Sequence, residues 1–134
     1  MPIPATPPGV VTVPSIYPVA DTTALLADAA TARGLTIFAT IDFSGDAAAV
    51  GLSMHDARLL IVGNPKGGTP AMVACPLAAL DLPLKLLVWA DARGDVRVGY
   101  NAPGYLQDRY GLSDDLARPL GIVRELVSDA LRPP

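Results

Sequence analysis

The chain has 134 residues, of which 51% are hydrophobic and 17% are charged, and its formal net charge is −3. This length is typical of one domain with a single core. The acidic balance gives no electrostatic basis for binding nucleic acid, and the apolar runs are too short to span a membrane. Because so few charges are available to cover the surface, we expect a second copy to cover part of it, as in a homodimer.

The first nine residues, MPIPATPPG, contain four prolines. This composition predicts a flexible arm over residues 1–9, followed by a single domain over residues 10–134. The arm has neither the basic start nor the apolar stretch of a secretion signal, so we expect a cytoplasmic protein. The single cysteine, Cys75, excludes an intramolecular disulfide and a cysteine-clustered zinc site.

The first predicted element is a strand over Val10–Tyr17. Pro14 places this strand at a sheet edge or at a bulge, because proline cannot donate to the sheet ladder. A helix capped by Asp21 or Thr22 then runs to Arg33.

A second strand is predicted over Thr36–Phe43 by its clean alternation of side chains. A short helix follows over Ser44–Gly51, with Ser44 or Asp42 as its N-cap. The apolar run Ala57–Val62 predicts a buried strand.

A glycine-rich segment, GNPKGGTP, follows this buried strand. Thr69 is a suitable N-cap and Pro70 a suitable first helical residue, so we expect a helix to begin there. The backbone amides of Gly67, Gly68 and Thr69 would then converge beside Lys66 and form an anion cradle. The alternative is a tight turn in which the lysine is solvated. The lysine precedes the glycines, so this is not the phosphate-binding loop of nucleotide hydrolases.

Beyond this segment, the helical pattern of residues 69–80 is interrupted at Pro76. Two strands, Leu82–Ala90 and Val96–Tyr100, form a predicted hairpin. Placing Gly94 in the left-handed region avoids a positive φ at a non-glycine residue.

This hairpin register sets Val88 opposite Val98 and Trp89 opposite Arg97. One face of the hairpin is then a core face, made of Leu84, Leu86, Val88, Ala90, Val96, Val98 and Tyr100. The other face carries Lys85, Leu87, Trp89 and Arg97, and we expect a dimer partner or a helix to cover Leu87, Trp89 and Arg97.

The C-terminal third is predicted to be helical. A helix over residues 102–110 is capped by Asn101, and Ser113 opens a last helical region in which Pro119 marks a first turn or a kink. Taken together, the elements predict an α+β fold with a mostly antiparallel sheet of about five strands and helices packed on one face.

Three segments resemble the domain-of-unknown-function 302 family of small bacterial proteins. They are Gly63–Met72, Asp81–Lys85, and Tyr100–Leu106 with Arg109 and Tyr110. The resemblance extends from about Val10 to the C-terminus. It implies a topology similar to that of the TATA-binding protein, a homodimer, and no established activity. One departure is Phe43, where the family commonly has a histidine.

The leading functional hypothesis is a non-catalytic homodimer that binds a small molecule or anion, without a cofactor or metal. Its candidate ligand-binding residues are Asn64, Lys66, Gly67, Gly68, Thr69 and Arg109. Arg109 and Tyr105 are neighbours on one helical face. This arrangement suits either a pair of side chains that binds a substrate or a pair that packs a corner of the fold.

Two alternatives remain open. One is a small hydrolase or isomerase that uses Asp42, Asp81 or Lys85, although both aspartates also suit capping positions. The other is a structural module for protein–protein interaction. His55 has no paired nucleophile and is expected at the surface, whereas Cys75 is expected to be a small core residue.

Overall fold

The computed structural model describes residues 5–133, so part of the predicted N-terminal arm, residues 1–4, lies outside it. Five antiparallel strands form one sheet in the order β1-β5-β4-β3-β2. The strands are β1 (Val10–Ser15), β2 (Thr36–Asp42), β3 (Ala57–Gly63), β4 (Leu84–Ala90) and β5 (Val96–Asn101). The predicted α+β class and antiparallel sheet are therefore confirmed.

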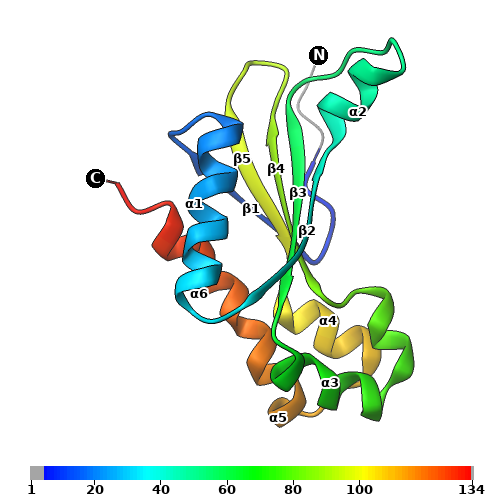
Figure 1. Cartoon of the computed structure of the whole chain (residues 1–134). Coiled ribbons are helices and arrows are strands. Elements are labelled where there is room, and N and C mark those ends of the chain that lie inside the picture. The colour runs from blue at the N-terminus through cyan, green and yellow to red at the C-terminus, as the bar shows by residue number, and fades with distance from the viewer. Residues whose placement is uncertain (1–4, 134) are drawn as a thin grey trace.

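Helices α1 and α6 lie on one face of this sheet, whereas α3, α4 and α5 gather at one end of it (Figure 1). The α-helices are α1 (Val19–Ala32), α2 (Phe43–Ala49), α3 (Pro65–Ala74), α4 (Pro103–Tyr110), α5 (Asp114–Ala117) and α6 (Ile122–Ala130). Two short 3-10 helices, η1 (Pro76–Leu80) and η2 (Arg118–Gly121), connect them. No helix of the described residues is both long and apolar enough to cross a membrane.

The core lies between the sheet and helices α1 and α6. Leu86 and Val88 of β4 are fully buried, as are Leu26 of α1 and Leu126 of α6. Burying one such side chain contributes roughly 1.5–3 kcal/mol. The intervening residues of β4 point to the opposite face and are only half-buried, because successive side chains of a strand alternate.

The predicted hairpin register is confirmed. Val88 pairs with Val98 and Trp89 with Arg97. Gly94 has a φ of 83°, so it adopts the left-handed conformation predicted for it.

The predicted start of α1 is wrong, because the helix begins at Val19. Thr22 is no cap: its hydroxyl donates to the Tyr17 carbonyl and contacts the Ser15 hydroxyl, and the residue is buried. The threonine thus ties the helix to the end of β1.

The structure also decides the predicted N-caps of α2 and α4. Asp42, rather than Ser44, caps α2 by accepting from the Gly45 amide at 2.9 Å. Asn101 does not cap α4, because it pairs with Val10 as the last residue of β5, and Ala102 takes the N-cap position.

The remaining C-terminal predictions are confirmed. Ser113 caps α5 by accepting from the Leu116 amide, and Pro119 lies in the 3-10 segment between α5 and α6.

Gly9, the last residue of the predicted N-terminal arm, packs against Tyr105 of α4. A Cβ added at Gly9 would lie 2.3 Å from the Tyr105 ring.

Candidate functional site

A cavity of about 320 Å³ lies where β3 runs into α3 at the helical end of the sheet. Its wall is mostly apolar and includes Phe38 of β2, Met72 of α3, Pro83 before β4, and Pro119 of η2. This volume is at the lower end of the range for small-molecule sites in proteins. The cavity is therefore a candidate site for a small molecule.

The predicted anion cradle is not formed. Helix α3 begins at Pro65, with Asn64 as its N-cap, five residues before the predicted start. The Asn64 side-chain oxygen accepts from the Lys66 amide at 3.0 Å, and its carbonyl accepts from the Gly67 and Gly68 amides at 2.9 Å. These donors are satisfied within the chain, so they do not converge on an anion. Asn-Pro and Thr-Pro both suit a helix start, and the earlier pair forms the cap.

The structure nevertheless brings four of the six candidate ligand residues to the cavity. Asn64, Gly67, Gly68 and Thr69 line it, whereas Lys66 and Arg109 are absent from its wall. Lys66 is exposed. Ligand binding by these residues stays a prediction. A ligand in the cavity would contact the side of helix α3 rather than free backbone amides at its start.

Two glycines of the wall allow close packing, and a third leaves space. A Cβ on Gly67 would lie 3.0 Å from Pro119 Cβ, and one on Gly63 would lie 3.3 Å from Pro83 Cβ. A Cβ on Gly68 would meet only Met72 Cε, at 3.9 Å. A side chain at Gly68 could thus extend into the cavity without its Cβ clashing with neighbouring atoms.

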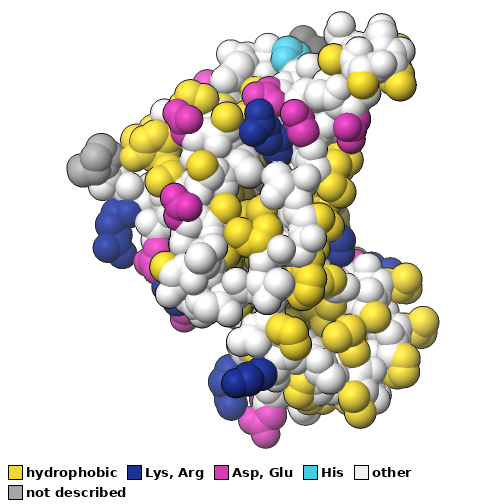
Figure 2. Space-filling view, in the orientation of Figure 1, with side chains coloured by type: hydrophobic (Ala, Val, Ile, Leu, Met, Phe, Trp, Pro, Cys, Tyr) yellow, Lys and Arg dark blue, Asp and Glu magenta, His cyan; other side chains and the backbone are white. Residues whose placement is uncertain are grey.

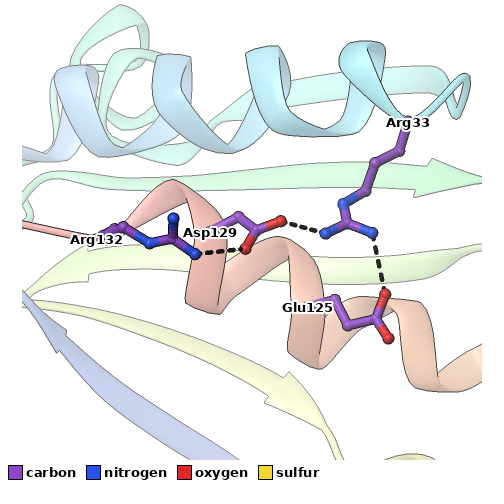
Figure 3. A network of polar contacts seen from close by, with 4 residues as sticks. All are labelled: Arg33, Glu125, Asp129 and Arg132. Atoms are coloured by element: carbon purple, nitrogen blue, oxygen red, sulfur yellow. Dashed lines mark hydrogen bonds and ion pairs between the residues drawn. The ribbon is translucent and has the colours of Figure 1, made fainter.

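Arg33, at the end of α1, is the charged residue among the described residues of the wall. Its guanidinium donates to Glu125 Oε2 at 3.0 Å and to Asp129 Oδ2, both on α6 (Figure 3). Asp129 also accepts from Arg132, at 3.3 Å. These carboxylates, Asp129 first, raise the pKa of Arg33. The network contains two positive and two negative groups, so the charge of Arg33 is compensated.

Asp42, one of the three candidate catalytic groups, acts as a cap. The Gly45 amide and then the Ser44 hydroxyl hold the pKa of Asp42 below its usual range. Ser44 also contacts Asp56, at 2.8 Å. A carboxylate held ionised by a helix start is a poor proton donor at neutral pH.

Asp81 and Lys85, the other two candidates, are also engaged within the chain. Asp81 accepts from the Tyr110 hydroxyl and forms an ion pair with Arg109 at 3.2 Å, so it joins η1 to α4. Lys85 Nζ lies 3.4 Å from the Pro83 carbonyl oxygen. None of the three candidates belongs to the described wall of the cavity, and the hydrolase or isomerase hypothesis gains no support from the geometry.

The predicted interface residues lie on the sheet face opposite α1 and α6. Leu87 and Trp89 are half-buried there, and Arg97 donates to Asp91 at 3.3 Å. Trp89 lies over Gly99, where an added Cβ would be 3.1 Å from its ring.

The two isolated candidates take the positions expected of them. His55 is exposed in the segment before β3. Cys75 is half-buried at the end of α3 and packs against the core.

Sequence reasoning missed Phe38 as a cavity residue. The β2–β3 register shifts between Ile37 and Ala39, so the strand bulges at Phe38. A bulge changes the direction of a side chain, and the regular alternation of this segment gives no signal of it. Phe38 remains 51% exposed, at the rim.

The match to a family model decides the classification. The model "Domain of unknown function DUF302" matches residues 11–130. The chain belongs to the DUF302 family. The resemblance seen in the sequence is therefore confirmed.

A solved structure supports the fold of this DUF302 chain. The crystal structure of an uncharacterized conserved DUF302 protein from Bacillus stearothermophilus has a TM-score of 0.76 to this chain, at 18% identity. The match covers 93% of this chain and 97% of the other.

Curated relatives are longer than this DUF302 chain. Proteins named fluoride-specific ion channel FluC 1, from Brucella suis and Brucella abortus, are each 38% identical over 111 residues. That segment is 81% of this chain but only 44% and 41% of the respective relatives. The chain thus spans less than half the length of these relatives.

The Asp81–Tyr110 contact predicts a measurable titration. The hydrogen bond to Asp81, then burial, raises the pKa of Tyr110. A raised folded-state pKa stabilises the fold below the unfolded pKa, and that stabilisation is lost as the pH rises through the folded value. We expect Tyr110 to ionise at lower pH in Asp81→Asn, as measured by phenolate absorbance with Tyr110→Phe to assign the signal. An unchanged Tyr110 titration in Asp81→Asn would contradict the contact.

Proposed function

We propose that this chain is a non-catalytic binding domain whose ligand occupies the cavity between β3, α3 and η2. The observation that supports it is a mostly apolar cavity of about 320 Å³ at the junction of β3 and α3. Protein interiors contain few voids larger than a water molecule, whose share of liquid volume is about 30 Å³. A space of this size that opens at a half-exposed Phe38 suits a small molecule.

Gly68 supports the same proposal. It lies within α3, where glycine costs about 0.5–1 kcal/mol relative to alanine. Gly67, its neighbour, allows the close approach of Pro119, but Gly68 meets no such contact. The absent side chain at Gly68 keeps the cavity open.

Filling the cavity tests this function. We expect a fragment set of uncharged, anionic and cationic compounds to contain members that raise the Tm of the protein, because a ligand that binds only the folded state stabilises it. Gly68→Leu should abolish these shifts by placing a side chain in the cavity. Gly104→Leu is the matched control, because a Cβ at Gly104 has nothing within 4 Å and Gly104 is absent from the wall.

The measurement is a thermal shift for each fragment, with circular dichroism to confirm that both variants fold. Shifts that survive Gly68→Leu would contradict the proposed site. Equal loss in Gly104→Leu would also contradict it, because the effect would then not depend on the cavity.

We also propose that the outer sheet face, defined here by Leu59, Ile61, Leu87 and Trp89, forms a homodimer interface. Its members are half-buried, apolar and on the face opposite α1 and α6. The charged groups beside them, Lys85 and Arg97, are engaged within the chain.

A second apolar surface allows a matched test of the dimer. Hydrophobic side chains gather over α3 and η1 (Figure 2), where Leu77 is 66% exposed. We expect Leu87→Lys to yield monomers and Leu77→Lys to leave the dimer intact, because a lysine is costly at the centre of an apolar interface. Light scattering after size exclusion measures both masses. A monomeric unchanged protein, or dissociation by Leu77→Lys alone, would contradict the outer face as the interface.

A further inference from the structure

The charge of the cavity wall points to the chemistry of its occupant, given the binding function proposed above. Among the described residues of the wall, Arg33 has the charged side chain, and its two terminal guanidinium nitrogens face carboxylates of α6. A ligand charge placed in this cavity would therefore find no unpaired opposite charge on the part of the wall that the structure describes. Burying an ionised group without a partner is unfavourable.

The remaining wall suits a flat ring. Phe38 presents an aromatic ring, Met72 a thioether, and Pro65, Pro83 and Pro119 present pyrrolidine rings. Aromatic pairs prefer offset or edge-to-face contact, and thioether sulfur contacts aromatic rings favourably. These side chains surround the cavity from β2, α3, η2 and the segment before β4, so a planar apolar ligand meets them on several sides.

Two uncharged polar side chains complete the wall. Asn64 accepts from the Lys66 amide through its side-chain oxygen, which leaves its NH₂ group as a donor. The Thr69 hydroxyl can donate or accept. One hydrogen-bonding group on the ligand is thus matched by the protein.

We propose that the cavity takes an uncharged aromatic ring with a hydrogen-bonding group, and that Glu125 and Asp129 determine this preference by neutralising Arg33. The two carboxylates lie 92 and 96 residues from Arg33 in sequence, on a helix that packs against α1. Their effect on the ligand is indirect: they are positioning residues that hold Arg33 in an ion-pair network (Figure 3).

Three probes that share one ring system test the class of ligand. Indole is uncharged at neutral pH, indole-3-carboxylate is an anion and tryptamine is a cation. By calorimetry with the unchanged protein, we expect indole to bind at least about tenfold more tightly than either charged probe, a difference of about 1.4 kcal/mol. Preferential binding of a charged probe would overturn the class while leaving the cavity as a binding site. Failure of every probe and of every fragment would overturn the binding function as well.

Releasing Arg33 tests the role of the carboxylates. In Glu125→Gln/Asp129→Asn, the guanidinium loses both anionic partners and becomes able to pair with a ligand. We expect affinity for indole-3-carboxylate to rise about tenfold or more, and affinity for indole to change less than about threefold. The indole measurement also shows that the cavity persists when the ion pairs between α1 and α6 are removed.

Two controls separate this effect from others. Asp28→Asn/Asp46→Asn changes the net charge equally at exposed sites and should not raise affinity for the anion. Adding Arg33→Gln to the Glu125→Gln/Asp129→Asn protein should remove the gain. An anion affinity that is unchanged by releasing Arg33, or equally raised by the Asp28 and Asp46 substitutions, would overturn the assignment to Glu125 and Asp129.

Discussion

The one-sided burial of the sheet is the constraint on which the rest of the structure depends. Leu60, Leu86 and Val98 on the three central strands are fully buried toward α1 and α6. This layer fixes the strand register, because a slip by one residue would turn the whole set toward the outer face. It also turns the outer face of the sheet away from α1 and α6, and it places the cavity at the end of the layer, where α3 and η2 contribute to the wall.

Local sequence patterns predicted much of this fold. Alternation along β4 and β5 identified the inner face, and the glycine at position 94 fixed the hairpin register. The helix starts were less predictable. Thr22 has the right chemistry for a cap but is used to join α1 to β1, and Asn64 and Thr69 are competing caps within six residues. Propensity at one position does not rank such alternatives, because packing elsewhere decides between them.

The candidate site was predictable only in part, for the same reason. The glycine-rich segment was correctly identified as unusual, but its amides are used within α3. The role of Gly67 depends on Pro119, and that of Gly63 on Pro83, which are distant in sequence. Arg33 likewise gives no local signal of its partners on α6. A cavity is a product of such long-range contacts, so its wall emerges only when the whole chain is folded.

The location of the bound ligand is the most direct test of this account. Amide chemical shifts of the isotopically labelled protein, recorded by NMR during an indole titration, should change most at Gly63, Gly68 and Met72. The amide of Gly94, in the β4–β5 turn, should remain unchanged. Shifts that centre instead on Leu87 and Trp89 would place the ligand on the outer sheet face and contradict the cavity as the functional site.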